Sequence, residues 1–356
     1  MDNLYDASID YTVRKKGENQ CVGFVASFID DRYAPGGERL LEPAAALLGE
    51  LICDPVTYHG RFVPEYFESE KTNLLEAIRS LINDKRDWAD SRLLRALCDG
   101  EAYAVPRLGD EETVDKLQAL KVYTQYRDLI STAPLEIIYS GSAELERVKQ
   151  ALAAAFATLP REEVRVISTA APHVCRESVQ HVEDVLDVTQ GKLGMGFSCG
   201  SDDMPALLMG NTLFGGSSNS KLFLNVREKL SLCYYASSLY HRQKGLITVS
   251  SGIEFQNYQR AYDEIMAQLE AVQKGELEDW ELEGARSTLL NNYATVGDSQ
   301  GKLENFYLGQ AATGQHETPA DLARAIQDMT AERICRAMST VNLDTVYFLK
   351  GKEAEA

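Results

Sequence analysis

Apolar residues in this chain recur at strand and helix spacing in two successive blocks. The first block predicts one strand, three helices and a closing strand, at 20–29, 38–53, 66–83, 88–99 and 135–139. The second block predicts the same succession, at 246–253, 258–273, 280–296, 301–312 and 345–349. Strands followed by helices and a last strand are typical of an α+β fold with helices packed on one face of a sheet.

The shared order indicates an internal duplication. A Lys-Gly pair precedes the first strand of each block, at Lys16-Gly17 and at Lys244-Gly245. The alternative is a pair of unrelated α+β domains. Because the element order and spacing agree, we favour two tandem units of one fold, each with an antiparallel-rich sheet.

The two units are expected to meet in the segment 159–178, which holds prolines and charges but no clean periodicity. We therefore assign residues 1–165 to the first domain and 179–356 to the second. The second domain should open with one long strand over 179–199, followed by a helix over 203–213.

The stretch from 211 to 238 carries the most specific pattern of the chain. Gly215 and Gly216 allow backbone geometry that is closed to residues with a β-carbon. Ser217 or Ser218 can cap the helix that follows. One buried helix face is predicted from the spacing of Leu222, Phe223, Val226 and Leu230.

Two polar side chains stand out in this stretch. Arg227 lies on the predicted helix, and Tyr234, seven residues later, opens a segment that we interpret as a strand. Together they can present a cation and a phenol on one side of a groove. Each residue taken alone is also compatible with an ordinary amphipathic helix after a glycine turn.

In this order the residues resemble the C-terminal half of the M16 (insulinase-like, pitrilysin-like) zinc peptidases. There a glycine-rich turn leads into a helix that ends in Arg-Glu-Lys-x-x-Leu-x-Tyr. The residues in that pattern here are Arg227, Glu228, Lys229, Leu232 and Tyr234. The resemblance implies two tandem M16-type units of the LuxS/MPP-like α+β fold.

The resemblance also implies roles for these residues. In the family, the equivalents of Arg227 and Tyr234 reach toward the substrate and the zinc site of the other half. Arg227 would hold a substrate carbonyl or carboxylate, and Tyr234 would donate a hydrogen bond to the oxyanion of the tetrahedral intermediate. Gly215, Gly216 and Ser217 complete the predicted substrate-binding site.

The zinc-binding motif of the family is missing from this sequence. M16 enzymes bind zinc through His-x-x-Glu-His on a helix of the first unit, which directs two histidines at the metal and a glutamate at its bound water. None of the five histidines forms such a pair. Since Tyr5 corresponds to Tyr234 in the duplication, we expect the first unit to lack its N-terminal strand and zinc helix. An exposed strand edge and apolar helix faces should result.

The third zinc ligand of the family also has no counterpart. It is a glutamate seven residues after another acid, and Glu70 matches that auxiliary acid. The ligand position then falls on Ala77, which has no metal-binding atom. Glu76 is adjacent, but one residue turns a helical side chain by about 100°. Glu76 would take the place of the third zinc ligand only if the alignment with the family motif is shifted by one residue.

Composition narrows the possible partners. A net charge of −18 argues against nucleic acid or an anionic membrane as a partner. Seven scattered cysteines without a CxxC pair fit reduced thiols in a cytoplasmic protein. No signal-peptide pattern and no apolar run long enough to span a bilayer is present in the sequence.

These features predict a non-catalytic M16 homologue that binds peptide or protein in a chamber, as the inactive subunit of a heteromeric zinc protease. We assign it no catalytic residue, metal ligand or cofactor of its own, since zinc would be carried by a partner. That partner would be a zinc-bearing M16 homologue, and a homodimer is the other possibility. A zinc-bearing homologue encoded next to this chain would favour this hypothesis.

Two other functions stay open. One is a scaffold or binding protein without proteolysis. The other is an active zinc metalloendopeptidase whose metal helix lies upstream of Met1, which would also need a substitute for Ala77. The runs 28–33 and 74–85 further resemble bacterial M16-like proteins associated with the 5-aminopentanol modification of elongation factor P.

Overall fold

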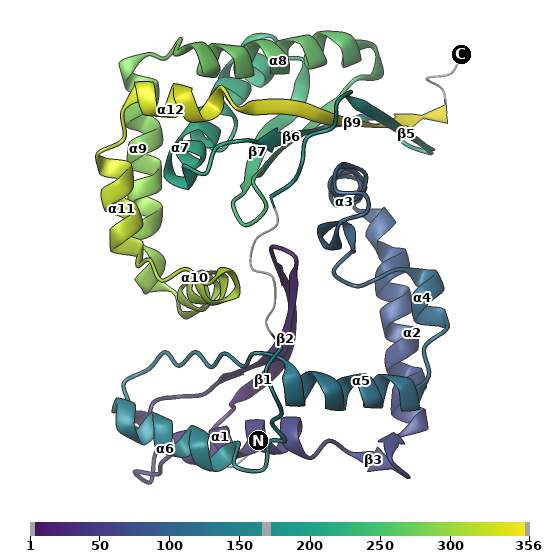
Figure 1. The fold of residues 1–356 in the computed structure, drawn as a ribbon, viewed down its shortest axis with the longest axis vertical. Helices are drawn as coiled ribbons and strands as arrows, with labels where there is room; N and C mark the ends of the chain where they lie inside the picture. Colours follow the sequence, from purple (N-terminus) through teal and green to yellow (C-terminus); the bar gives the residue numbers. More distant parts are fainter. Residues whose placement is uncertain (1–3, 166–171, 353–356) are drawn as a thin grey trace. The chain divides into compact units, whose positions relative to one another are not determined.

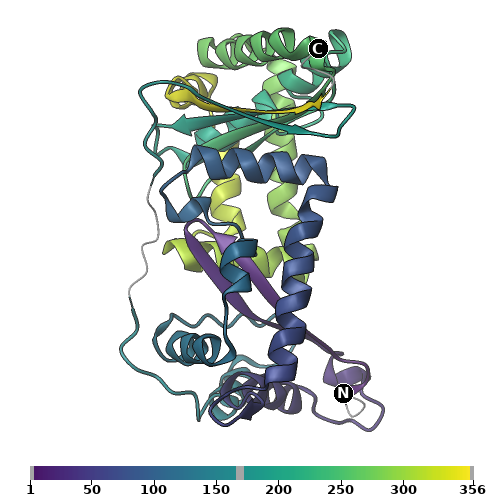
Figure 2. The ribbon, with the colours of Figure 1, turned by 90° about the vertical axis from the view of Figure 1, so that its right-hand side faces the viewer.

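The computed structural model describes residues 4–165 and 172–352. The chain is α+β, which confirms the predicted fold class (Figures 1 and 2). It divides into two compact units, Met1–Arg79 with Arg107–Ser168 and Ser80–Pro106 with Thr169–Ala356. The predicted division into 1–165 and 179–356 therefore differs from the packing at residues 80–106. No helix in the described ranges is long and apolar enough to cross a membrane.

The first unit contains short sheets and separate helices. Its elements are β1 (Ser8–Lys16), β2 (Asn19–Ser27), η2 (Asp31–Tyr33), α1 (Leu41–Cys53), β3 (Thr57–Tyr58), β4 (Arg61–Phe62), α2 (Pro64–Ser80), α4 (Glu111–Asp115), α5 (Ala119–Thr132) and α6 (Leu145–Ala155).

The second unit contains the large sheet. Its first elements are η3 (Leu81–Asn83), α3 (Lys85–Leu97), η4 (Ala102–Ala104), β5 (Gln180–Leu186), β6 (Gly191–Cys199), α7 (Met204–Phe214), η5 (Leu222–Lys229), β7 (Cys233–His241) and β8 (Leu246–Ile253). They are followed by η6 (Phe255–Asn257), α8 (Tyr258–Lys274), α9 (Asp279–Ala294), η7 (Val296–Asp298), α10 (Gln300–Thr313), α11 (Pro319–Gln327), α12 (Ala331–Met338) and β9 (Val341–Gly351).

Five strands of the second unit form one mixed sheet in the order β5-β9-β6-β8-β7 (Figure 1). β5 runs parallel to β9, whereas the other neighbours are antiparallel. The prediction of one continuous strand over 179–199 is wrong. The segment forms two strands, β5 and β6, because the last strand of the chain inserts between them.

One face of this sheet carries the main hydrophobic core. Leu193, Met195 and Phe197 of β6 point into it and are almost fully buried. Ile265 of α8 and Met338 of α12 close the core from the other side. Burial of such side chains contributes about 1.5–3 kcal/mol each. This core is the largest apolar cluster among the described residues.

The opposite face of the sheet is covered by α3, which lies across the strands from α8 (Figure 2). Successive strand residues alternate between faces, so Gly194 and Gly196 point at this helix. A Cβ at Gly196 would lie 2.7 Å from Cδ2 of Leu97, and one at Gly194 would lie 3.2 Å from Cδ2 of Leu93. The glycines of β6 therefore permit a close helix approach, which draws residues 80–106 into the second unit. The second face is thus covered by a helix of the first predicted block.

The sheet of the first unit is a two-stranded hairpin of β1 and β2. Tyr11 pairs with Phe24 and Val13 pairs with Val22, which places these four side chains on one face. That face is open, with Tyr11 81% and Val22 54% exposed. The described part of this unit thus leaves an apolar strand face in water.

The strand predicted at 135–139 is not formed. Leu135, Ile137 and Tyr139 keep the alternating pattern, but their segment joins no ladder and all three side chains are exposed. A strand is stabilised by backbone hydrogen bonds to a neighbouring strand. Its counterpart in the second unit, 345–349, is part of β9 because β5 and β6 flank it.

Candidate functional site

The helix that carries Arg227 is a π-helix, η5. Its backbone bonds span five residues, as in the 3.0 Å contact of the Leu230 N–H with the Asn225 carbonyl. The widened turn rotates Leu230 out of the predicted buried face, and Leu230 is exposed whereas Leu222 and Val226 are buried. The prediction for Leu230 is therefore wrong. π-helices are rare and occur frequently at functional sites.

Tyr234 stands at a second irregularity. β7 pairs with β8 through Cys233 opposite Ile253 and Tyr235 opposite Gly252, so Tyr234 is the extra residue of a β-bulge. A bulge redirects the side chain of the residue it inserts. Tyr234 is 60% exposed and follows the buried Cys233. Its hydroxyl donates to the Glu254 carboxylate. This hydrogen bond raises the pKa of Tyr234, so the phenol remains a donor at neutral pH.

Arg227 is half-exposed and only loosely held. Its guanidinium carbon lies 4.7 Å from the centroid of the Phe223 ring, and its Nη1 lies 3.5 Å from Oε1 of Glu228. Burial raises the pKa of the Cys233 thiol to about 11, and the charge of Arg227 partly opposes that shift. The cation therefore lies close to the residue that precedes Tyr234. The structure brings these two predicted site residues to the same end of β7.

The glycine turn has a packing role. Gly215 is buried, and a Cβ there would lie 2.7 Å from Cδ1 of Leu222 and 2.8 Å from the backbone nitrogen of Ser238. The Ser238 N–H donates to the Gly215 carbonyl at 2.9 Å. Close approach to the edge of β7 explains this glycine, and its φ of −153° is open to any residue.

The other turn residues lie nearer the surface. Gly216 is exposed, and a Cβ there would lie 2.9 Å from Nδ2 of Asn211. Ser217 was expected to cap the helix, but its hydroxyl donates to the Thr212 carbonyl at 3.3 Å. The hydroxyl that accepts from the helix start is that of Ser220, at 3.4 Å from the Phe223 nitrogen.

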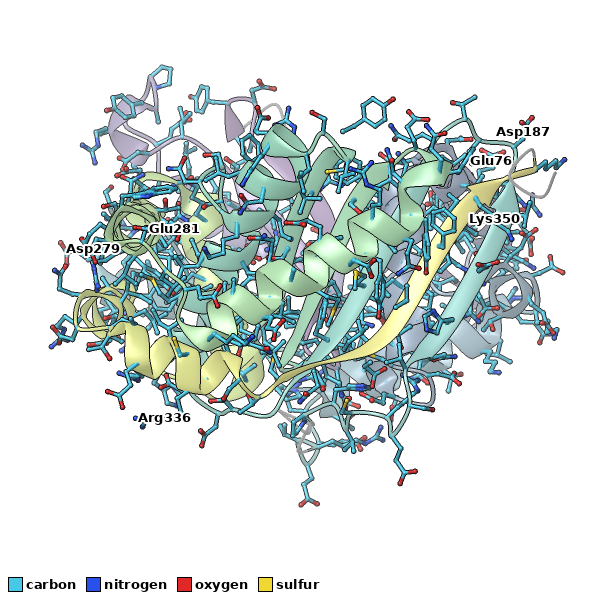
Figure 3. All side chains as sticks on the ribbon, turned by 90° about the horizontal axis from the view of Figure 1, so that it is seen from above. Glu76, Asp187, Asp279, Glu281, Arg336 and Lys350 are labelled. Carbon is cyan, nitrogen blue, oxygen red and sulfur yellow. The ribbon has the colours of Figure 1, made fainter. Side chains whose placement is uncertain are left out.

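Two polar contacts fix the π-helix to its neighbours. Lys221, at its start, lies 3.0 Å from Oε1 of Glu281, and both side chains are buried. Figure 3 shows Glu281 next to Asp279 at the beginning of α9. Asn225 donates to Gln268 of α8 at 2.8 Å. Lys221 was not singled out from the sequence, because nothing in the pattern around it indicates burial.

The predicted zinc-ligand position lies on α2 of the first unit. Ala77 is half-buried there, whereas Glu76 and Glu70 are exposed. Adjacent residues of a helix diverge by about 100°. Glu76 and Ala77 therefore differ in exposure on α2, and the assignment of Ala77 to the ligand position stays a prediction.

Sequence reasoning missed one cluster of possible metal ligands. Cys98, Glu101 and His173 each offer a ligand atom within 4.8 Å of the others, and they form the one such group within residues 4–165 and 172–352. The three-residue spacing of Cys98 and Glu101 was the available signal. His173 lies too far along the chain for a local motif to include it.

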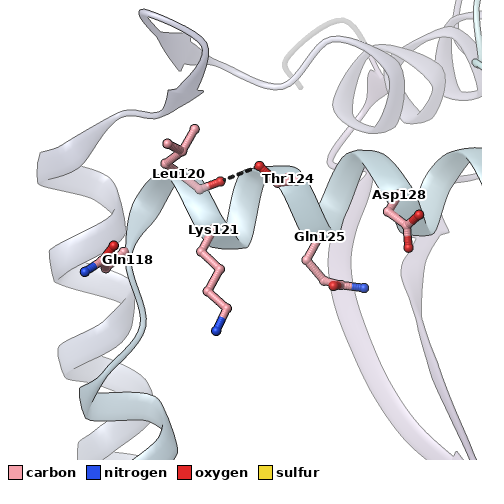
Figure 4. Close-up of a pocket in the computed structure, with 6 residues that line it drawn as sticks. All are labelled: Gln118, Leu120, Lys121, Thr124, Gln125 and Asp128. Carbon is pink, nitrogen blue, oxygen red and sulfur yellow. Dashed lines mark hydrogen bonds between the residues drawn. The ribbon is translucent and has the colours of Figure 1, made fainter.

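A shallow pocket of about 470 Å³ lies on α5 of the first unit (Figure 4). Its lining residues belong to the surface of that helix, and Lys121, Gln125 and Asp128 follow one side of it. Most of the lining surface consists of the apolar parts of these side chains, and their polar groups do not converge on one point. We assign no chemistry to this pocket.

The chain is similar in sequence to known proteins. The family model "Peptidase M16 inactive domain" matches residues 116–289. The chain is 34% identical over 360 residues to "Probable inactive metalloprotease YmfF" of Bacillus subtilis, which covers 99% of this chain and 83% of that protein. It is 20% identical over 318 residues to "Uncharacterized zinc protease YmxG" of the same organism, and the match covers 88% of this chain and 76% of that protein.

Solved structures show the same fold. A conserved protein from Enterococcus faecalis superposes with a TM-score of 0.84 at 27% identity, over 99% of this chain and 83% of that one. A peptidase M16 inactive domain from Pseudomonas fluorescens superposes with a TM-score of 0.75 at 17% identity, over 96% of this chain and 81% of that one.

The fold and the similarity to these relatives place the chain in the M16 peptidase class. The chain belongs to the peptidase M16 family, and it is a homologue of the family's inactive metalloproteases.

Proposed function

We propose that this chain binds extended peptide at Arg227 and Tyr234 and acts as the non-catalytic subunit of a zinc peptidase whose partner carries the metal. The peptide would lie in a chamber of the kind the family implies. The observation that supports this best is that a π-helix presents Arg227 and a β-bulge presents Tyr234 at one end of β7. Both irregularities weaken regular hydrogen bonding, and both expose a polar side chain.

The chemistry of the two side chains suits a peptide backbone. Arg227 offers several N–H donors, and the acid that it contacts in the described part of the chain, Glu228, lies 3.5 Å away. Tyr234 can transfer its hydroxyl hydrogen bond from Glu254 to a substrate carbonyl, since the ring is largely exposed. A charge-assisted hydrogen bond of this type is worth about 1.5–3 kcal/mol. Ala77 supports the non-catalytic role, because it removes a ligand from the family's zinc shell.

Binding of an unfolded polypeptide tests the site. Fluorescein-labelled β-casein would be titrated with the chain and followed by anisotropy. Arg227→Ala should weaken binding by about tenfold, the loss of one charged hydrogen bond, and Tyr234→Phe by a few fold. The matched controls are Arg336→Ala, an exposed arginine paired with Glu332 on α12, and Tyr307→Phe on α10. Equal affinities of Arg227→Ala and Arg336→Ala would rule the proposed site out.

A second experiment tests the partner. The chain would be mixed with a zinc-bearing M16 homologue from the same organism, and cleavage of β-casein would be measured. We expect activity of the mixture to exceed that of the homologue alone, and Arg227→Ala to reduce the excess. No excess at any ratio would favour a scaffold without proteolysis, and a role beside elongation factor P modification would then become the prediction to test.

A further inference from the structure

A buried polar cluster lies in the second unit where the end of α3 meets the sheet. It is centred on His173 and includes Cys98, Glu101, Lys244 and Asp344. Cys98 and Asp344 are fully buried, and Lys244 is 1% exposed. Ionisable groups in such surroundings need a compensating partner or ion. None of them belongs to the peptide site proposed above.

The imidazole of His173 bridges two carboxylates. Its Nε2 lies 3.2 Å from Oδ2 of Asp344, and its Nδ1 lies 2.5 Å from Oε1 of Glu101. Asp344 also accepts from the Arg176 N–H at 2.8 Å and from the Thr345 hydroxyl at 2.7 Å. These donors fix the Asp344 carboxylate, which can accept a hydrogen bond from Nε2 of His173 and so orient the ring.

Glu101 approaches the other ring nitrogen. Its Oε1 lies 2.5 Å from Nδ1 of His173, and its second oxygen contacts Lys244. A ring nitrogen and a carboxylate oxygen at this distance are held together by a cation between them, either a proton on the ring or a metal ion.

Cys98 favours the metal ion. Its Sγ lies within 4.8 Å of both other ligand atoms, and it stands one helical turn before Glu101 at the end of α3. Thiolate, imidazole and carboxylate are all zinc ligands. A carboxylate behind the second ring nitrogen, as Asp344 is here, is the usual partner of a zinc-bound histidine.

We propose that Cys98, Glu101 and His173 form a Zn²⁺-binding site, with Asp344 orienting His173. The metal takes the place of the proton between Nδ1 and Glu101, and the Cys98 thiol loses its proton to solvent on binding. Ligand bonds of about 2.0–2.3 Å hold the ligand atoms roughly 3.3–3.8 Å apart. The Glu101 carboxylate, the half-exposed member of the three, therefore moves away from His173 while Lys244 stays on its second oxygen.

The site would stabilise the second unit. It joins the end of α3 to His173, which in turn contacts β9 through Asp344. Lys244 lies in the turn after β7, whereas Tyr234 lies at the opposite end of that strand. The metal is therefore structural and separate from the peptide site, and the two proposals can fail independently.

Cobalt spectroscopy tests the ligand set directly. The full chain would be saturated with Co²⁺, and a thiolate-to-cobalt charge-transfer band in the near ultraviolet would report cysteine ligation. In parallel, protein incubated with Zn²⁺ and desalted should retain one equivalent by elemental analysis. Cys98→Ala and His173→Gln should lose both signals. Cys335→Ala, a half-buried thiol on α12, should retain both.

Three results would overturn the site. They are no retained zinc in the wild-type chain, a cobalt spectrum without the charge-transfer band, and full zinc retention by Cys98→Ala. Two of these results are measured on the wild-type chain, so the proposal can be tested even if a variant does not fold. Casein binding by Cys98→Ala should equal that of the wild-type chain, so loss of the peptide site and loss of the metal site are told apart.

Discussion

The two units of this chain follow a similar predicted order of elements but differ in how their strands are covered. The sheet of the second unit has α7, α8 and α12 on one face and α3 on the other. The hairpin of the first unit leaves an apolar face exposed around Tyr11 and Phe24. Alternating apolar residues thus become a core only where another element of the described chain packs against them.

The units also differ in their ion pairs. In the second unit, Lys221 and Glu281 are buried together. In the first unit, Arg147 bonds Glu42 at 2.6 Å and also contacts Asp31, with all three side chains partly exposed. Buried pairs are costly to break, whereas exposed ones are screened by solvent. We therefore expect the loss of one partner of an ion pair to destabilise the second unit more than the first.

The chain allows the two units to be followed separately. Both tryptophans, Trp88 and Trp280, lie in the second unit. Tryptophan fluorescence therefore reports on that unit, whereas far-ultraviolet circular dichroism reports on the helices of both. Coincident transitions from the two probes would indicate that the units unfold together.

The largest effect is expected from Phe197→Ala. Phe197 is fully buried in the main core, and its deletion should lower the free energy of unfolding by about 3–5 kcal/mol. Urea unfolding followed by tryptophan fluorescence measures the change. Leu239→Ala, at a 60% exposed position of the same sheet, is the control and should change it by less than about 0.5 kcal/mol. Similar midpoints for both variants would contradict the assignment of the core.

Lys221→Met should come next. It leaves Glu281 buried without its cation and should cost about 3 kcal/mol in the same assay. The double variant Lys221→Met/Glu281→Leu should recover part of this loss, because the uncompensated charge is gone. Lys274→Met, whose partner Glu270 is exposed, is the control with a cost of about 0–0.5 kcal/mol. No recovery in the double variant would mean that the pair is not the source of the loss.

A smaller effect is expected from acid on the first unit. Hydrogen bonds from Arg147 lower the pKa of Glu42 to about 2, from an ordinary value of 4.5, although burial opposes the shift. The unfolded chain therefore binds a proton at Glu42 more readily than the folded chain does. The contribution of Glu42 to the free energy of unfolding is complete above pH 4.5 and is lost as pH falls toward 2. Circular dichroism in moderate urea should show helix loss over this range.

The variant Glu42→Gln separates this pair from general acid effects. It should make the helix signal less steep between pH 4.5 and 2, since the group that titrates there is gone. Glu112→Gln, in an exposed pair with Lys116, should leave the profile as in the wild-type chain. An unchanged profile for Glu42→Gln would show that Arg147 does not hold this carboxylate in solution.

The smallest effect on stability is expected at the open hairpin. Tyr11→Ser/Phe24→Ser should change the free energy of unfolding by less than about 0.5 kcal/mol per site. The same change should reduce self-association and the binding of an apolar dye, because both depend on exposed apolar surface. Thr12→Ser, on the other hairpin face, is the control. A large loss of stability would indicate that this face is covered in solution.

Local patterns predicted the regular elements well. β8 has the predicted bounds, 246–253, and α8 differs by one residue at its end. Both lie in segments whose apolar period is uninterrupted. The segment 135–139 has an equally good strand pattern but no neighbouring strand, so the same signal fails there. Hydrogen-bonding partners far along the chain decide between the two outcomes.

The residues of the proposed site were chosen from the sequence, whereas the geometry around them could not be predicted from it. Arg227 and Tyr234 were identified from the sequence, whereas the π-helix and the β-bulge that expose them were not. Each irregularity depends on what packs behind it, such as Glu281 and Gln268 against η5. The glycines of β6 can be seen in the sequence. That they allow α3 to approach the sheet can be seen only in the folded structure.

The sequence by itself determined the family, the α+β class and the positions of most helices and strands, because these depend on local periodicity and a short motif. Only the tertiary structure decided that residues 80–106 pack on the second sheet, that one hairpin face stays open, and that Cys98, Glu101 and His173 meet. These outcomes depend on contacts between residues far apart in the chain. Steric fit and charge compensation decide such contacts, and neither produces a local pattern in the sequence.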